Sequence, residues 1–208
     1  MLLVLNMGLS SMTKCPTCKA PATLRINLKL FCSIDCAVSW SKLQADKSKA
    51  KKQKEFNAET RQRKQKLKTN AEWKSEAQAL FNKMRRLEEL LWFKEQGIEP
   101  YCISCQLPLG NDQWCCGHFK TRKARSDLAF DKNNTFLQHN HRCNQQLSGD
   151  IEGYKIGLAF RFGEARTREI IEYCETEKNI PKRSADDWQQ MKKEFSAEIR
   201  RLQRLLEI

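Results

Sequence analysis

Ten cysteines and three histidines are the side chains whose types and spacing could do chemistry in this chain. Four of the cysteines form a C-x2-C-x13-C-x3-C pattern near the amino end: Cys15, Cys18, Cys32 and Cys36. Each closely spaced pair can turn its thiolates toward one tetrahedral ion, so the pattern predicts a zinc site. Four thiolates leave no open coordination position, and we therefore expect this site to be structural.

A second structural zinc site is predicted from Cys102 and Cys105 together with Cys143 and one histidine. His139 is the favoured fourth ligand, because the H-x3-C spacing places it one helical turn before Cys143. His141 is the alternative, provided that the segment before Cys143 is extended. The other cysteines are expected to be packing residues or buried thiols: Cys115, Cys116 and Cys174.

Residues suited to phosphodiester hydrolysis lie between the two halves of the second site and directly after its last ligand. We expect His118 on a strand, Asn134 on a second short strand after a basic loop, and Asn144 on a helix that opens at the zinc ligand. This order resembles the HNH (ββα-metal) nuclease finger. The resemblance implies that His118 is the general base, that Asn134 orients it, and that Asn144 holds a divalent ion. The alternative for His118 is a structural strand histidine in a non-catalytic finger.

The surrounding sequence narrows this resemblance to one family. The run GHFKTRKARSDLAFDKNN and the later CNQQLSGD are similar to the pattern of the NinG (Rap) family of phage recombination proteins. The order of parts agrees as well: an amino-terminal four-cysteine knuckle, a basic helix, the central finger and a helical tail. The resemblance implies an endonuclease that cuts branched DNA, such as Holliday junctions and D-loops, with Mg2+ or Mn2+ as its catalytic ion.

Three positions depart from the family pattern. His139 stands where the final C-x2-C pair has its first cysteine, and zinc accepts imidazole in place of thiolate. Gly117 stands where HNH enzymes commonly carry an aspartate that binds the metal. Either the ion has fewer protein ligands, or a carboxylate from elsewhere replaces that aspartate: Asp112, Asp127 or Asp131. Ser148-Gly149-Asp150 stands where the family has SGN, and we expect this run to keep the turn.

Basic side chains that could contact phosphates directly follow the candidate base: Lys120, Arg122, Lys123 and Arg125. A second basic run extends from Lys42 to Lys68, with eleven basic residues against three acidic ones, and contains Lys51 and Lys52. Its composition predicts a long solvated helix, or a segment that orders only on its partner. Phosphate contacts carry no base information, so we expect DNA to be recognised by shape.

The net charge of +13 favours a polyanionic partner, and branched or double-stranded DNA is the first candidate. No stretch approaches the roughly 20 apolar residues that span a bilayer, so no membrane partner is expected. The opening MLLVLNMGL lacks the basic region of a signal peptide. We therefore expect a soluble protein in the cytoplasm of a bacterial host cell, where cysteines bind metal more readily than they pair.

Two apolar stripes at helical spacing indicate the elements that must hold the site. The first stripe ends before Gly97 and Pro100 and comprises Trp73, Ala77, Leu80, Met84, Leu87 and Leu91. The second follows a cap at Ser184 with Asp187 three residues on, and comprises Trp188, Met191, Phe195, Ile199, Leu202 and Leu206. Packing within one chain is the preferred interpretation, and pairing between two copies in a homodimer is the alternative.

These observations predict a small, zinc-stabilised α+β protein with a treble-clef or HNH-like ββα finger at its centre. The expected segments are an amino-terminal finger at 12–40, a basic helical segment at 41–97, the HNH-like domain at 98–165 and a helical tail at 166–208. The expected function is that of a divalent-metal-dependent DNA endonuclease. Two rivals are a zinc-finger recombination mediator that binds DNA without cutting it, and an adaptor whose helices hold other proteins.

Overall fold

The computed structural model describes residues 13–110, 113–180 and 182–208. The opening MLLVLNMGL and the candidate carboxylate Asp112 lie outside the described residues. Contacts divide the chain into two compact units, Met1–Leu67 and Lys68–Ile208. Each unit contains a two-stranded antiparallel sheet, and most other described residues are helical, so the protein is small and α+β as expected.

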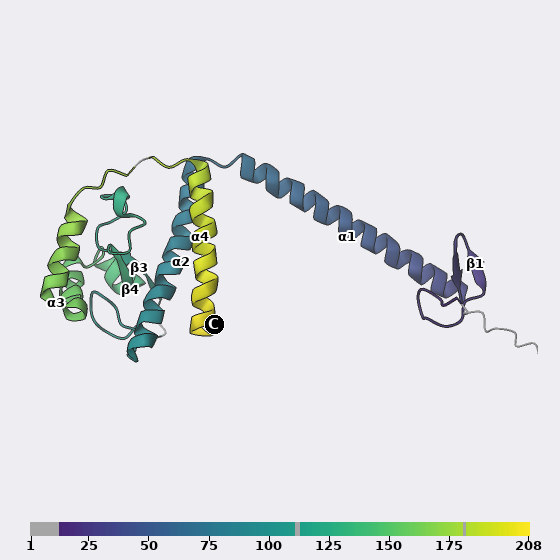
Figure 1. Ribbon diagram of the computed structural model, residues 1–208, viewed down its shortest axis with the longest axis horizontal. Coiled ribbons are helices and arrows are strands. Elements are labelled where there is room, and N and C mark those ends of the chain that lie inside the picture. The colour runs from purple at the N-terminus through teal and green to yellow at the C-terminus, as the bar shows by residue number, and fades with distance from the viewer. Residues whose placement is uncertain (1–12, 111–112, 181) are drawn as a thin grey trace, which may run out of the picture. The chain divides into compact units, whose positions relative to one another are not determined.

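A short hairpin and one helix form the first unit (Figure 1). Strand β1 (Leu24–Ile26) pairs with β2 (Lys29–Phe31) in an antiparallel register. Helix α1 (Ile34–Lys66) begins after Ser33, whose side chain accepts a hydrogen bond from the backbone N–H of Cys36. A small core holds these parts together: Cys15, Ala22, Phe31 and Ala37.

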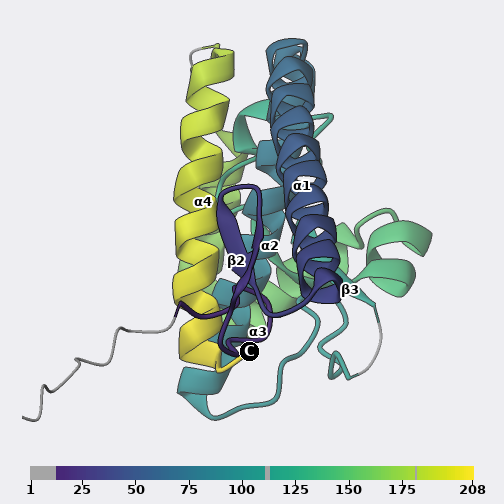
Figure 2. The same cartoon turned by 90° about the vertical axis from the view of Figure 1, so that its right-hand side faces the viewer.

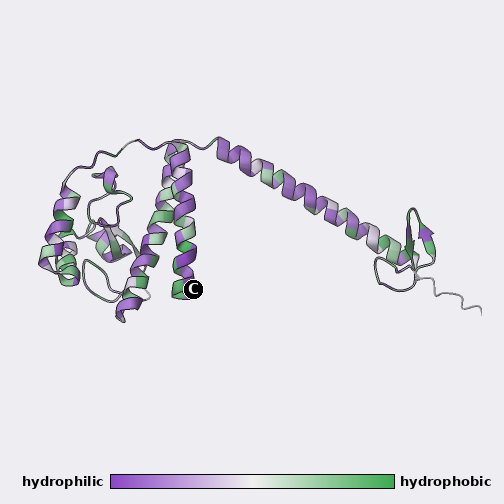
Figure 3. Ribbon diagram, in the orientation of Figure 1, coloured by the Kyte–Doolittle hydropathy of each residue, from purple (hydrophilic) through white to green (hydrophobic). Residues whose placement is uncertain are grey.

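Helix α1 carries the basic run and is exposed along almost all of its length. Ala37 is the only buried residue of this helix, and Phe56 exposes 63% of its surface. Hydrophilic residues dominate the helix (Figure 3). Without a packed apolar face, its stability has to come from helix propensity and from surface contacts such as the ion pair of Lys51 with Glu55, at 3.9 Å. The basic run therefore continues the helix of the amino-terminal finger.

Helices α2 (Asn70–Gln96) and α4 (Ala185–Leu206) form the frame of the second unit. Each begins with a capping box, at Thr69 and at Ser184. Helix α2 ends at Gly97, whose φ of 66° lies in the left-handed region that glycine adopts without strain. The two helices lie side by side and run in the same direction (Figures 1 and 2).

The apolar stripes of α2 and α4 pack against each other within one chain. One cluster comprises Phe81, Met84, Leu87, Ile199 and Leu202. Another comprises Trp73, Ala77 and Trp188. Phe130, from the segment between the strands of the second unit, packs against both clusters. The preferred interpretation of the stripes is confirmed, and the stripes themselves are not available to hold a second copy.

The second hairpin lies between this frame and helix α3. Strand β3 (Trp114–His118) pairs with β4 (Thr135–His139), and a turn of 3-10 helix lies in the loop between them. A π-helix (Asn140–Gln146) follows β4 directly. Helix α3 (Ile151–Glu175) comes next and is interrupted at Gly163, which has a φ of 78°.

A buried ionic network ties α2 to the hairpin and to α3. Arg85 donates hydrogen bonds to the hydroxyl and the carbonyl of Thr135, at 3.1 and 2.7 Å. Glu89 pairs with Arg85 at 3.1 Å and with Arg161 at 2.5 Å. Thr135 lies opposite His118 in the hairpin register, so the network fixes the strand end that carries the candidate base.

The predicted segments differ from this two-unit division at several places. The boundaries expected after residues 40 and 165 fall inside α1 and α3, whereas the one after residue 97 falls just beyond α2. In the described part of the chain, no helix combines the length and the apolar character needed to cross a membrane.

Candidate functional site

The four amino-terminal cysteines converge in the first unit, with their sulfur atoms within 4.8 Å of one another. Cys32 Sγ lies 3.3 Å from Cys18 Sγ and 3.4 Å from Cys36 Sγ. These separations are too long for a disulfide of about 2.05 Å. They approach the edge of about 3.8 Å that a tetrahedron with Zn–S bonds of about 2.3 Å would have. This cluster could bind zinc.

A second group of ligand atoms within 4.8 Å of one another lies in the second unit: Cys102, Cys105, His139 and Cys143. His139 Nδ1 is 3.3 Å from Cys105 Sγ, and its Nε2 is 3.2 Å from the carbonyl oxygen of Pro108. Because a carbonyl only accepts, Nε2 carries the proton and Nδ1 presents its lone pair to the sulfur atoms. His141 is exposed and outside the group, so the geometry favours His139 as the fourth ligand.

Both clusters share one backbone plan, and the C-x2-C-x2-P pattern common to CPTCKAP and CISCQLP is its sequence signal. In each knuckle the residue after the second cysteine has a positive φ, 67° at Lys19 and 56° at Gln106. The amide of the first cysteine donates to the carbonyl two residues beyond the second, at 2.8 and 2.9 Å. A hairpin and a pair of ligands four residues apart follow in each unit.

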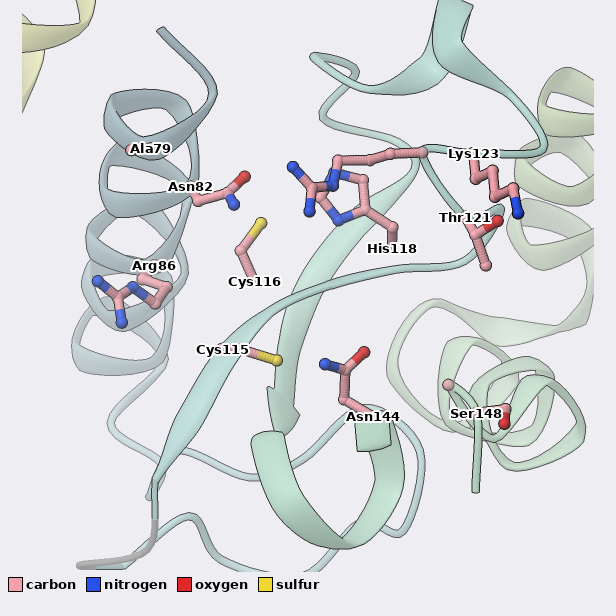
Figure 4. A pocket seen from close by; sticks show the side chains of 12 residues that line it. Ala79, Asn82, Arg86, Cys115, Cys116, His118, Thr121, Lys123, Asn144 and Ser148 are labelled. Atoms are coloured by element: carbon pink, nitrogen blue, oxygen red, sulfur yellow. The ribbon is translucent and has the colours of Figure 1, made fainter. Parts of the chain in front are cut away.

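An open pocket of about 710 Å³ lies between α2 and the second hairpin (Figure 4). Residues from α2, β3, the loop after β3, the π-helix and the following turn line it. Four of the predicted site residues are among them: His118, Arg122, Lys123 and Asn144. The tertiary structure therefore brings the candidate base, the candidate metal ligand and two basic side chains to one place.

His118 is the last residue of β3 and is partly buried. Its Nε2 lies 3.2 Å from the carbonyl oxygen of Ala129, so Nε2 carries the proton and Nδ1 is the basic nitrogen. Burial lowers the pKa of His118 below its ordinary value, and the positive charge of Arg122 acts in the same direction, while the backbone carbonyls of Ala129 and Cys116 oppose the shift in part. The imidazole is therefore neutral at neutral pH, as a general base has to be.

Asn134 is completely buried. It was expected within the second strand but lies immediately before β4. Its Oδ1 accepts a hydrogen bond from the Lys120 amide at 2.7 Å, and its Nδ2 donates to the carbonyls of Lys120 and Leu128 at 3.0 and 3.1 Å. None of these bonds reaches His118. Asn134 instead closes the loop that presents the Ala129 carbonyl, so any effect on the histidine passes through the backbone.

Asn144 lies in the π-helix and lines the pocket, with its Nδ2 3.4 Å from Asn140 Oδ1. The candidate carboxylates are engaged elsewhere. Asp127 pairs with Arg125 at 2.5 Å, and Asp131 accepts a hydrogen bond from the Tyr173 hydroxyl at 2.5 Å. Because the described pocket lining contains no carboxylate, a divalent ion beside Asn144 would need its other oxygen ligands from bound phosphate groups and water.

The glycine before His118 has no room for a side chain. A Cβ on Gly117 would lie 2.4 Å from Gln138 Oε1 and 2.8 Å from Gln138 Cβ. Gln138 is itself fixed, because its Nε2 donates to Ser104 Oγ and to the Gly149 carbonyl, both at 2.7 Å. An aspartate at position 117 would therefore clash with Gln138 in this packing. The hydrogen bond from Gln138 to Gly149 also anchors the Ser148-Gly149-Asp150 turn, in which φ is 50°, 96° and 46°.

The four basic residues after the base differ in their surroundings. Arg122 and Lys123 are exposed and line the pocket, and Lys120 pairs with Glu175 at 3.6 Å. Arg125 has a different role from the phosphate contact expected, because it is bonded internally. Besides Asp127, its guanidinium donates to three carbonyls at the end of α3, at 2.6 to 3.1 Å: Cys174, Glu175 and Thr176.

Helix α2 forms one wall of the pocket, and its lining residues were not predicted from the sequence. Asn82 and Arg86 project from α2 opposite the hairpin residues (Figure 4). They flank the apolar stripe, and only folding shows that this side of α2 faces the site. Burial raises the pKa of Cys115 to about 11 and that of Cys116 to about 12, so both remain neutral thiols at the pocket floor.

Two other expectations concern residues outside the pocket. Lys51 and Lys52 lie on exposed faces of α1 in the first unit, available to a polyanion. Cys174 is a fully buried thiol in the core shared by α3 and the hairpin, as expected.

Comparisons with known proteins give one consistent match. The family model described as "Bacteriophage Lambda NinG protein" matches residues 7–207 of the chain. The protein named "Protein ninG" from Escherichia phage 933W is 33% identical over 108 residues, which cover 52% of this chain and 49% of that protein. Its namesake from Salmonella phage P22 is 34% identical over 108 residues, covering 52% and 48%.

The corresponding protein of Escherichia phage lambda is 28% identical over 140 residues, which cover 67% of this chain and 62% of that protein. The aligned part of the chain thus spans about half to three-fifths of the length of these relatives. No solved structure matches the chain.

Proposed function

Because the chain belongs to the NinG family, we propose that it is a structure-specific endonuclease that hydrolyses phosphodiester bonds in branched DNA, such as Holliday junctions and D-loops, during phage recombination. The observation that carries this proposal is that His118, Asn144, Arg122 and Arg86 line one pocket. A neutral imidazole supplies a base, and the cationic side chains suit a phosphate. The net charge of +13 supports DNA as the partner.

The order of elements in the second unit supports an HNH-like, treble-clef finger. A zinc knuckle is followed by a hairpin with His118 at the end of its first strand, and then by a short helix with Asn144. The zinc group would tie the knuckle to the helix, which keeps Asn144 near the strand. Structural zinc contributes directly to the folding of such small modules.

The residues of the pocket would act in distinct ways on bound DNA. His118 would take a proton from the attacking water at Nδ1, while the Ala129 carbonyl holds its Nε2 proton. Asn144, together with phosphate oxygens, would hold Mg2+ or Mn2+. A divalent ion there supplies positive charge for the developing oxyanion. Arg122 and Arg86 would hold the phosphates on either side of the scissile bond.

A recombination mediator that binds DNA without cutting is the second candidate. The observation that favours it is the lack of a carboxylate in the described lining of the pocket, since Mg2+ is usually bound through one or two carboxylates. A homodimer would place two pockets on one junction in either case. Because the apolar stripes are buried within one chain, such a dimer would have to use other surfaces.

The test is cleavage of a labelled four-way junction and of a linear duplex with the same sequence. The protein, a His118→Ala variant and a His141→Ala control are compared with Mg2+ or Mn2+ and with none. The control removes an exposed histidine that lies outside both the pocket and the zinc group. We expect ion-dependent cutting of the junction that the control retains and His118→Ala loses by at least about a hundredfold.

Tight junction binding without cutting under either ion would contradict the endonuclease and favour the mediator. Undiminished cutting by His118→Ala would leave the nuclease standing but would exclude His118 as its base.

A further inference from the structure

A second hollow, of about 440 Å³, lies in the second unit beside the loop that joins β3 to β4. We call it the loop pocket. The chemistry proposed above does not use it. Its walls come from the start of α2, the β3–β4 loop, the segment after α3 and the start of α4.

The lining of the loop pocket is strongly basic. Five cationic side chains and two carboxylates line it: Lys74, Arg125, Lys178, Lys182 and Arg183, with Asp127 and Glu177. Asp127 is neutralised by Arg125 at 2.5 Å and also accepts the Lys178 amide at 3.1 Å. Lys74 and Lys182 are exposed, and no described carboxylate pairs with either. Such a surface attracts a polyanion and releases its counterions.

The loop pocket and the His118 pocket share one wall. Residues 121–123 of the loop line the His118 pocket, and residues 124–127 line the loop pocket. Lys123 and Ala124 are consecutive, so the linings of the two hollows adjoin along the chain, with these Cα atoms about 3.8 Å apart. A nucleic acid that reached the His118 pocket would therefore also come close to the loop pocket.

This shared wall is held rigidly at both ends. Asn134 bonds the backbone of Lys120 and Leu128 on either side of the loop, at 2.7 to 3.1 Å. Arg125 ties the middle of the loop to the last carbonyls of α3, the nearest at 2.6 Å. An ordered loop with a basic hollow on each side can hold two phosphate backbones apart.

We infer that the loop pocket binds the phosphate backbone of a second DNA arm at a branch point, while the first arm occupies the His118 pocket. The inference rests on the proposed action on branched DNA and adds the element that would distinguish a branch from a duplex. Arg183 contributes a cation held over the rings of Phe130 and Trp188, at 5.9 and 5.2 Å. Its position is thus set before DNA arrives, which lowers the entropic cost of binding.

The test uses binding, so that it does not depend on cutting. In a His118→Ala background without divalent ions, a Lys74→Glu/Lys182→Glu variant is compared with Lys193→Glu/Arg200→Glu. The control makes the same change in charge at two exposed positions of α4 that line neither pocket. Affinity for a four-way junction and for a linear duplex is measured across a series of salt concentrations.

We expect the loop-pocket variant to lose at least about tenfold in junction affinity relative to the control, with a salt slope shallower by about two. Its duplex affinity should match that of the control. Equal losses on junction and duplex, or equal losses in both variants, would overturn the inference. The milder Lys74→Gln/Lys182→Gln variant should show the same selective loss, which separates a binding effect from a folding defect.

The two proposals can fail separately. A selective loss of junction binding in a protein that cuts nothing would contradict the endonuclease and leave the second-arm site standing. Junction-selective cutting that persists in Lys74→Glu/Lys182→Glu with His118 restored would overturn the second-arm site and leave the endonuclease standing.

Discussion

At the scale of single residues, the tautomer and the charge of His118 are set by its surroundings. A backbone carbonyl fixes one ring nitrogen, and burial keeps the other uncharged at neutral pH. Asn134, the residue that the resemblance assigns to orienting it, acts on the loop backbone instead. The geometry of the base therefore depends on an ordered loop more than on one side-chain contact.

The pKa of His118 leads to a prediction about pH. Because burial lowers this pKa below about 6.5, the base is neutral above that range and becomes protonated only as the pH falls further. The rate of junction cutting should be nearly level from about pH 8 to pH 7 and should fall as the pH drops through the lowered pKa. Single-turnover rates with saturating Mg2+ provide the measurement. A half-maximal rate above pH 7 would contradict this assignment, and His141→Ala should leave the profile unchanged.

Arg122 and Arg125 form a matched pair, three residues apart, with opposite predicted effects. Arg122→Ala should make the salt dependence of DNA binding shallower by about one and leave the melting temperature unchanged, because Arg122 is an exposed part of the pocket lining. Arg125→Ala should lower the melting temperature by several degrees, because it breaks the links from the loop to Asp127 and the end of α3. Binding isotherms and thermal unfolding followed by circular dichroism test both. The reverse pattern would show that Arg125 is the phosphate contact.

At the scale of elements, α1 is a helix without a packed face. Of its residues only Ala37 is buried, so the basic run is free to meet a partner along most of its length. A charged helix of this kind is either a solubilising surface or a polyanion contact. Salt dependence separates the two, since only the contact releases counterions.

Replacement of Lys51 and Lys52 by glutamine tests this helix. We expect the salt dependence of DNA binding to become shallower by about two, with zinc content unchanged. Helix content should change little, because glutamine is about as good a helix former as lysine and the exposed Lys51–Glu55 pair contributes only about 0.3 kcal/mol. Lys193→Gln, on α4 and outside both pockets, is the control. Unchanged slopes in the double variant would assign this part of α1 to solubility alone.

At the scale of the whole molecule, the chain repeats one construction twice. A knuckle, a hairpin and two ligands four residues apart occur in each compact unit. In the second unit, long helices pack around the hairpin, and residues 119–134 connect its two strands. In the first unit, residues 27–28 connect the strands. That longer connection carries both the basic loop and the backbone carbonyl that holds His118.

Two clusters in separate units predict independent metal binding. The purified protein should hold two zinc ions per chain, and Cys18→Ser should hold one while the second unit still melts at its original temperature. Cys105→Ser should lose the other ion and also unfold the pocket, because its cluster anchors the hairpin and the π-helix. Metal analysis with thermal unfolding measures both effects. Loss of both ions from either single variant would contradict independent sites.

The sequence by itself determined the features that depend on neighbours along the chain. Ligand spacing identified both groups of candidate zinc ligands, and apolar stripes with their end signals identified α2 and α4. The composition of the basic run indicated the long exposed helix α1 as one of two interpretations. These signals are readable because a helix or knuckle brings together residues only three or four positions apart.

Only the tertiary structure decided which distant residues share the site. Asn82 and Arg86 reach the pocket because the packed stripes turn that side of α2 toward the hairpin. Arg125 is withdrawn from the surface by the end of α3, and Gly117 is kept without a side chain by Gln138. Each outcome depends on contacts between elements far apart in the chain, and local spacing carries no information about them.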